Sequence, residues 1–134
     1  MSHQTEVKYD DLEYTPEGLF LLDGQPYSGT ALNRDSEGRK VSEVPFLNGR
    51  EHGVARSWYA NGQLAEETPY LDGTMHGIRR EMFEDGSLQS EEVIEFGTLM
   101  RKAVHDHKGQ LVDHYERQPS DPLYQNVLQR RSQL

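Results

Sequence analysis

The stretch that decides the fold is LNGREHGVARSWYANGQLAEETPY at residues 47–70, followed by LDGTMHGIRREMFEDGSLQSEEVIEF at residues 71–96. The two segments align position by position, and their glycines recur 24 residues apart. The recurring glycines are Gly49, Gly53 and Gly62 in the first segment and Gly73, Gly77 and Gly86 in the second. A repeat of fixed period predicts stacked supersecondary units, each of which contacts mainly its neighbours.

The repeat extends in both directions along the chain. Residues 22–46 form an earlier unit, and residues 97–118 form a degenerate one that keeps Gly97, Gly109 and Leu111. We therefore treat the chain as a single domain of 134 residues with repeated parts. These parts are an N-terminal strand cap at 1–21, repeats at 22–46, 47–70, 71–96 and 97–118, and a C-terminal helix at 119–134.

Alternation of side-chain character predicts strands within each repeat. Residues 53–59 and 77–83 alternate with a period of two, as expected for side chains that point to opposite faces of a sheet. Trp58 and Tyr59 are adjacent and should therefore lie on opposite faces. The expected fold is all-β, an elongated single-layer antiparallel meander of about four hairpins with a short C-terminal capping helix.

Dipeptides that end in glycine mark the expected turns. Asn61-Gly62 and Asp85-Gly86 are typical of a tight hairpin turn with positive φ. Asn48-Gly49 and Asp72-Gly73 mark the reverse turns between hairpins.

The C-terminal segment PSDPLYQNVLQRRSQL at 119–134 has the signature of a helix. Asp121 is a suitable N-cap and Pro122 a suitable first helical residue. We expect this helix to fold back over the last hairpin and cover the exposed edge of the sheet. A partner-binding arm and a disordered tail are the alternatives.

Composition excludes several classes of function. With 14 basic and 23 acidic residues the chain carries a formal charge of −9, which disfavours nucleic acid and anionic membranes as partners. It has no cysteine, so disulfides and thiolate catalysis are excluded. It lacks an apolar run of the roughly 20 residues that a membrane span needs. The polar N-terminus does not resemble a secretory signal, and we expect a cytoplasmic protein.

Catalytic motifs are absent from the sequence. It contains no Gly-x-Ser-x-Gly elbow, phosphate loop or dinucleotide fingerprint, so we do not expect an enzyme. His52 and His76 occupy the same repeat position, which favours a structural role in the turn. His105, His107 and His114 could form a three-histidine zinc site if the last hairpin brings them together. The degenerate character of that repeat argues against it, and we expect no metal and no cofactor.

Carboxylates also recur with the repeat. Glu43, Glu67 and Glu91 share one repeat position and should form a stripe on one face. Glu81 and Glu84 add charge to the same central region. A solvated polar face and an acidic surface for a basic partner are both consistent with this pattern.

The pattern G-x-x-H-G-x-x-x-x-W-Y-x-N-G-Q-L-x-x-E-x-x-Y resembles the bacterial variant of the MORN repeat. It is carried by Gly49, His52, Gly53, Trp58, Tyr59, Asn61, Gly62, Gln63, Leu64, Glu67 and Tyr70. The resemblance covers about residues 18–116. Many small bacterial proteins of this kind are regarded as antitoxins or immunity proteins, and others are scaffolds or membrane-linked adaptors.

The resemblance and the acidic composition together lead to one hypothesis and one alternative. The hypothesis is an immunity protein or antitoxin that covers the active or substrate-binding site of a cognate protein toxin, which we expect to be basic. The expected partner-binding residues are Trp58, Tyr59 and Phe83 as anchors and Glu43, Glu67, Glu81, Glu84 and Glu91 as steering charges. The alternative is a scaffold or adaptor module. The sequence leaves the oligomeric state open.

Overall fold

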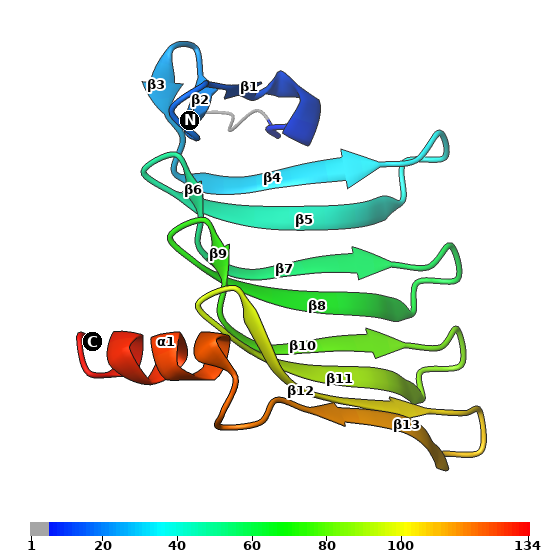
Figure 1. The fold of residues 1–134 in the computed structure, drawn as a ribbon. Coiled ribbons are helices and arrows are strands. Elements are labelled where there is room, and N and C mark those ends of the chain that lie inside the picture. The colour runs from blue at the N-terminus through cyan, green and yellow to red at the C-terminus, as the bar shows by residue number, and fades with distance from the viewer. Residues whose placement is uncertain (1–5) are drawn as a thin grey trace.

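The computed structural model describes residues 6–134 and is built almost entirely from antiparallel strands (Figure 1). The elements are η1 (Tyr9–Asp11), β1 (Glu13–Tyr14), β2 (Phe20–Leu22), β3 (Gln25–Pro26), β4 (Gly29–Arg34), β5 (Lys40–Leu47), β6 (Arg50–Glu51), β7 (Gly53–Trp58), β8 (Leu64–Leu71), β9 (Thr74–Met75), β10 (Gly77–Met82), β11 (Leu88–Glu95), β12 (Thr98–His105), β13 (Leu111–Glu116) and α1 (Pro122–Arg131). The all-β meander of hairpins with one C-terminal helix is therefore confirmed.

One long sheet holds the four hairpins in chain order. Its strands follow one another as β4-β5-β7-β8-β10-β11-β12-β13, while the short strands β6 and β9 pair with β5 and β8. A separate three-stranded sheet, β1-β2-β3, precedes it. In the degenerate last repeat a single eight-residue strand, β12, takes the place of a short strand followed by a longer one. The glycine that interrupts the earlier repeats at Gly53 and Gly77 has no counterpart there.

The turns differ from the sequence-based prediction. Both residues have positive φ at Asn48–Gly49 (52° and 85°) and at Asp72–Gly73 (49° and 85°), which are the turns between hairpins. At the hairpin tips the positive φ belongs to the glycine alone, as at Gly62 (85°). Asn61 instead accepts a hydrogen bond from the N–H of Gln63 through its side chain. The asparagine and aspartate before the tip glycines therefore serve as side-chain acceptors and not as left-handed residues.

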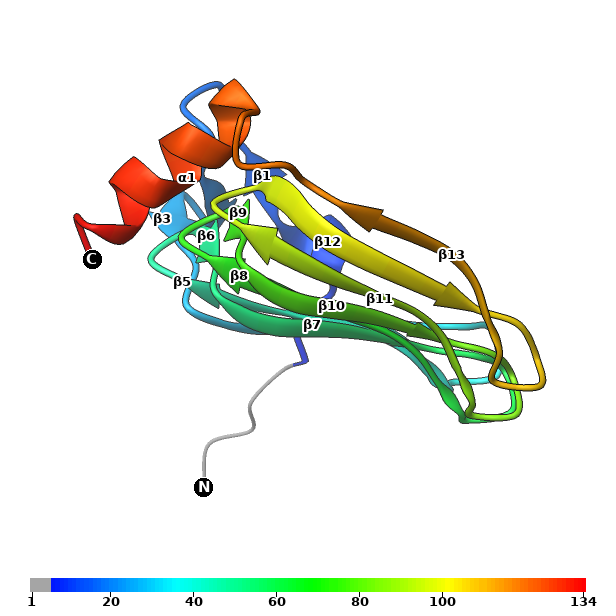
Figure 2. The ribbon, with the colours of Figure 1, turned by 60° about the horizontal axis from the view of Figure 1, so that its bottom comes forward.

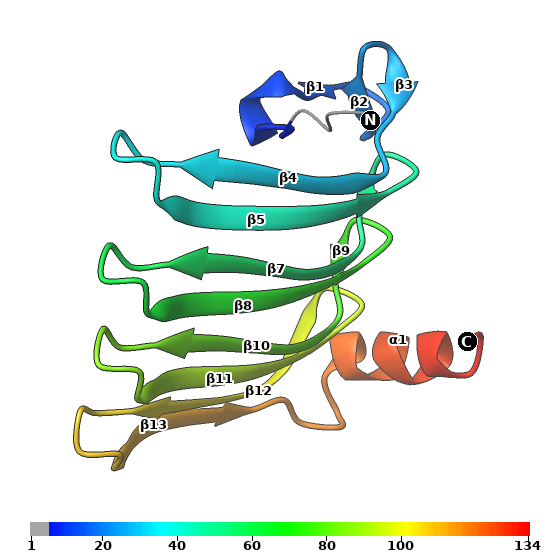
Figure 3. The same ribbon diagram turned by 180° about the vertical axis from the view of Figure 1, so that it is seen from behind.

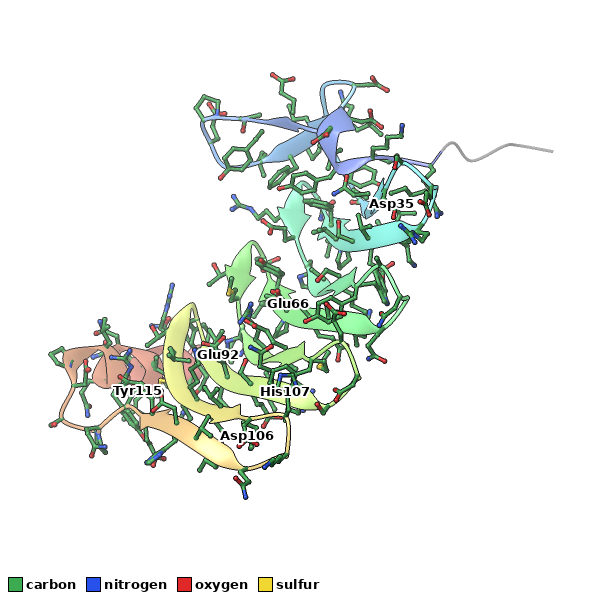
Figure 4. All side chains as sticks on the ribbon, turned by 90° about the vertical axis from the view of Figure 1, so that its right-hand side faces the viewer. Asp35, Glu66, Glu92, Asp106, His107 and Tyr115 are labelled. Atoms are coloured by element: carbon green, nitrogen blue, oxygen red, sulfur yellow. The ribbon has the colours of Figure 1, made fainter. Side chains whose placement is uncertain are left out.

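The long sheet is bowed. Small side chains from neighbouring strands meet on one face, where Ser42 of β5 lies opposite Ser57 of β7. Seen from the end of the stack and along the tips, the N-terminal sheet and α1 both lie on the side toward which the sheet curves (Figures 2 and 4). We call this side the concave face. Residues buried on it include Ala31, Phe46, Thr68, Ser90, Ile94 and Met100.

The N-terminal elements cap one end of the sheet. The ring of Phe46, which is 4% exposed, lies 5.0 Å from that of Phe20 and 5.7 Å from that of Tyr27 between centroids. The free edge of β4 is covered at its middle, where the N–H of Leu32 donates to the carbonyl of Val7 over 2.8 Å. The aromatic cluster buries apolar surface, and this backbone bond covers part of an edge that would otherwise be exposed.

The C-terminal helix has the expected cap but not the expected position. The N–H of Leu123 donates to the Asp121 carboxylate over 2.8 Å, and Pro122 is the first helical residue. The helix packs beside β12 at one end of the strands, with Val127 1% exposed (Figure 3). All six residues of β13 remain exposed. The prediction that the helix covers the last edge of the sheet is therefore wrong.

Neither helical segment of residues 6–134 has the length and apolar character that crossing a bilayer requires.

Candidate protein-binding face

The strand register assigns the charged residues of the central hairpins to two opposite faces. Glu66 and Glu67 are neighbours in β8, so their side chains point to opposite faces of the sheet. Glu91 and Glu92 in β11 are separated in the same way. The concave face carries Ser42, Val44, Ala55, Ser57, Glu66, Thr68, Arg79, Glu81, Glu92 and Lys102. The opposite, convex face carries Glu43, Arg56, Glu67, Arg80 and Glu91.

The predicted stripe of Glu43, Glu67 and Glu91 lies on the convex face, but arginines separate its members. Arg56 lies 3.1 Å from Glu67 and 3.7 Å from Glu43 between guanidinium nitrogen and carboxylate oxygen. Arg80 lies 2.9 Å from Glu91. The row is therefore a ladder of alternating sign, and most of its negative charge is balanced locally. The sequence-based stripe missed this alternation because Arg56 and Arg80 lie on the intervening strands.

The predicted anchor Trp58 also lies on the convex face, near the hairpin tips. Its ring is half-buried, and the Lys40 ammonium lies 4.6 Å from the ring centroid. Lys40 also approaches Glu43 to 3.3 Å. This cation–π contact covers part of the indole and leaves the remainder accessible.

Tyr59 and Phe83 connect each hairpin tip to the next one. The Tyr59 hydroxyl donates to the carbonyl of Met82 over 2.7 Å. Phe83, at the equivalent repeat position, stacks on His107 with ring centroids 3.9 Å apart. Glu84 is exposed at the same tip, and its carbonyl accepts from the Asn61 amide. The two aromatic rings therefore contribute to the stacking of the hairpins, and a role for them in partner binding stays a prediction.

On the concave face one arginine holds three carboxylates. Arg79 lies 2.8 Å from Glu66, 2.6 Å from Glu81 and 2.6 Å from Glu92. Burial alone would lower the pKa of Arg79, but the hydrogen bonds that its guanidinium donates to Glu92, Glu66 and Glu81 outweigh this effect and raise that pKa above its ordinary value. Lys102 is 4.0 Å from Glu92. Three carboxylates face two cations here, so the cluster has a net charge of −1. Figure 4 shows Glu66 and Glu92 on this side of the sheet.

A hollow lies on the concave face next to the Arg79 cluster. It has a volume of about 210 Å³. Its lining includes the small side chains of Ser42, Ala55, Ser57 and Thr68, with Val44, Tyr70 and Glu66 around them. The hollow exists because small residues occupy the middle strands where the sheet bends. A side chain or a short extended segment of another protein could enter it from the open side.

The three histidines of the candidate zinc site are not brought together. His105 ends β12 opposite Leu111, His107 lies in the following turn against Phe83, and His114 lies opposite Ala103. Among residues 6–134 there is no group of three or more His, Asp or Glu side chains that could hold a metal ion. The alternative of a three-histidine site at the last hairpin therefore has no support from the geometry of these residues.

The structural role expected for the repeated histidines is confirmed. Nδ1 of His76 accepts a hydrogen bond from the N–H of Phe96, and Nδ1 of His52 accepts one from the N–H of Asp72 at 3.4 Å. Each histidine directly precedes a hairpin and supports the turn at the end of that hairpin.

Sequence reasoning missed the concave cluster of Glu66, Arg79 and Glu92. Alternation indicated that adjacent carboxylates point to opposite faces, but it did not indicate the direction in which the sheet bends. The one available signal was the run of small residues at Ser42, Ala55 and Ser57, which marks the inner side of a curved sheet.

Comparison with known proteins gives a family match to one part of the chain. Residues 51–72, which contain β7, the following tip and β8, match the model of a family described as MORN repeat variant. The match supports a protein-interaction module built from MORN-type hairpins. A comparison with curated proteins gives no significant match.

Three solved chains match the structure. One is described as the crystal structure of accessory secretory protein 1,2 and 3 in Streptococcus pneumoniae, with 12% sequence identity and a TM-score of 0.40. The alignment covers 87% of the present chain and 20% of the other. The present chain therefore spans a fifth of the length of that chain.

Proposed function

We propose that this protein is an interaction module that acts as an immunity protein or antitoxin: it binds a basic bacterial toxin on its concave face and blocks the toxin's active site. The observation that carries the proposal is the open hollow beside the Arg79 cluster. This surface is shaped by the sheet itself and is flanked by the N-terminal sheet and α1 (Figure 2).

Charge supports the choice of the concave face. The chain has a net charge of −9, and the cluster of Glu66, Glu81 and Glu92 exceeds its cations by one negative charge. On the convex face, three cations, Lys40, Arg56 and Arg80, balance the three glutamates. A basic segment of a partner gains more from the concave cluster, where part of the carboxylate charge is left without a counterion.

Occlusion is the mechanism that these residues support. A basic loop of the toxin would place a Lys or Arg side chain beside Glu66 and Glu92 and a smaller side chain in the hollow. Trp58, Glu43, Glu67 and Glu91 would lie on the far side of the sheet from this contact. Inhibition of this kind needs neither a cofactor nor a reaction on the antitoxin.

Two linked experiments test the function. The tagged protein is purified from its native cells, the co-eluting partner is identified, and that partner is expressed alone in a neutral host. The proposal expects growth arrest, which co-expression of this chain relieves. A partner that is harmless when expressed alone would overturn the antitoxin function.

A scaffold or adaptor is the second candidate, favoured by the MORN repeat match, because it requires binding but no inhibition. In that case the partner is not toxic, and loss of this chain changes the location or assembly of the partner instead of its activity.

A further inference from the structure

The two edge strands of the long sheet, β4 and β13, differ in how far other parts of the chain cover them. At β4, the chain's own residues Val7 and Lys8 pair with Leu32 and occupy the middle of the edge. At β13, every residue is exposed, and α1 lies beside β12 instead of along this strand (Figures 1 and 3). Large apolar side chains project from the open strand, with Leu111 57%, Val112 60% and Tyr115 41% exposed.

The pairing between hairpins inside the sheet shows which kind of strand can pair with an edge like that of β13. Between consecutive hairpins, the second strand of one pairs antiparallel with the first strand of the next, as β5 pairs with β7 and β8 with β10. β13 is the second strand of its hairpin. Val104 and Asp113 are paired just before a bulge, as Ser57 and Glu66 are in an earlier hairpin. Asp113 therefore occupies the position of Glu66, which pairs with the following hairpin through Glu81.

Side chains contact two of the outward backbone groups of β13. The N–H of Arg117 points toward β12 and donates to the carbonyl of Met100, so the alternate residues His114 and Glu116 direct their backbone groups outward. The N–H of His114 donates to the Asp113 carboxylate over 2.9 Å. The Gln118 amide donates to the carbonyl of Glu116 over 3.2 Å. Both caps are single, exposed side-chain contacts that an incoming strand can replace.

We propose that β13 is a docking edge for an extended strand of a partner protein, which adds antiparallel to β13 as the first strand of a further hairpin would. The partner strand carries apolar side chains that pack on Leu111, Val112 and Tyr115. It also carries a basic side chain near Asp113. When a carbonyl of the partner strand accepts the hydrogen bond from the N–H of His114, the Asp113 carboxylate is left free to pair with that basic side chain. The contact continues an interface that the sheet already makes between its own hairpins.

A second copy of this chain is a poorer occupant of the edge. The strand that would continue the stack from a second copy is its β4, whose residue Leu32 is already paired with Val7 and Lys8 of its own chain. The docking edge is separate from the concave face, so this inference goes beyond the antitoxin function and does not depend on the identity of the toxin.

The test uses the intact, isotope-labelled protein and a synthetic peptide of residues 51–60, EHGVARSWYA, which contains the strand that adds to β5. In an NMR titration we expect shifts that concentrate on the amides of His114 and Glu116. We also expect the hydrogen exchange of these two amides to slow by about tenfold or more, because each becomes bonded to a backbone carbonyl.

Two N-methylated peptides provide the matched control. One carries methyl groups on the alternate backbone nitrogens along one edge of the peptide strand, and the other carries them along the opposite edge. One version should lose all effect on β13 and the other should keep it, because a strand pairs through one edge. Equal behaviour of the two versions, or shifts confined to the concave face, would overturn the proposal.

The state of the protein without peptide is a further check. We expect a mass of 15.4 kDa by light scattering and rapid exchange of the Glu116 amide. Twice that mass, with the Glu116 amide already protected, would show that a second copy occupies the edge and would contradict the assignment of a partner strand.

Discussion

His76 and Phe96 are joined across one repeat: the backbone N–H of Phe96 donates to Nδ1 of His76 over 2.9 Å, and the two rings lie 4.5 Å apart. Phe96 has a φ of 51°, a left-handed conformation that is unfavourable for a bulky residue. Asn48 and Asp72 occupy the equivalent positions in earlier repeats. The histidine and the neighbouring helix hold this turn, because Arg130 also lies 5.4 Å from the Phe96 ring.

Replacement of His76 should therefore cost more stability than replacement of His52. The His76→Ala variant leaves the N–H of Phe96 without its acceptor, and we expect a loss of about 1–2 kcal/mol in the free energy of unfolding. The matched His52→Ala variant should lose less, because its bond to the N–H of Asp72 is longer, at 3.4 Å, and lies at an exposed turn. Urea unfolding of both variants measures the difference, and equal losses would contradict the role given to His76.

The glycines of the repeat differ in what an added methyl group would meet. A Cβ at Gly77 would lie 2.9 Å from Cγ of Pro69, whereas a Cβ at Gly62 would have no heavy atom within 4 Å. Both glycines have positive φ, at 130° and 85°. We expect Gly62→Ala to cost about 1–2 kcal/mol through backbone strain alone.

For Gly77→Ala we expect a further loss of about 1–3 kcal/mol, because Pro69 cannot move without disturbing β8. Chemical denaturation of the two variants gives the comparison. A Gly77→Ala protein as stable as Gly62→Ala would show that the strands separate easily at this position.

The attachment of α1 should depend on pH. The hydrogen bond from Arg131 lowers the pKa of Glu95 below its ordinary value of 4.5. The ionised form of Glu95 is thus favoured in the folded protein, so its contribution is complete above pH 4.5 and is lost as the pH falls through the lowered pKa.

We therefore expect the helix to loosen in acid, with Val127 as the reporter because its side chain is 1% exposed in the docked helix. The methyl signals of Val127 should move toward solvent-exposed values below pH 4.5, and Glu95→Gln should remove this pH dependence. A transition that persists unchanged in the Glu95→Gln variant would assign it to another group.

The repeated part of the fold was predictable because its causes are local. The spacing of Gly49, Gly73 and Gly97 defines the turns between hairpins, and alternation within residues 53–59 defines a strand. Asp121 and Pro122 defined the start of the helix for the same reason.

The missed features depend on contacts between distant residues. The position of α1 depends on the pairing of Arg131 with Glu95, 36 positions earlier in the chain. The balance of the convex stripe depends on register between strands, which places Arg56 between Glu43 and Glu67. The separation of the three histidines depends on the register that places His105 opposite Leu111 and His114 opposite Ala103, and on the stacking of His107 on Phe83 of the preceding hairpin. Periodicity within a single strand contains none of this information.

The central claim is that the concave face binds a basic partner, and two charge-reversed variants test it directly. Glu66→Lys/Glu92→Lys changes the concave face, and Glu67→Lys/Glu91→Lys makes the same charge change at adjacent positions on the convex face. Circular dichroism first confirms that both proteins keep their strands. The association rate constant with the co-purified partner is then measured at low and high salt.

We expect the concave variant to associate about tenfold or more slowly at low salt, with a weaker dependence on salt, while the convex variant stays close to the unmodified protein. Slow association of the convex variant together with normal association of the concave one would contradict the claim and assign binding to the face of Trp58, Glu43, Glu67 and Glu91.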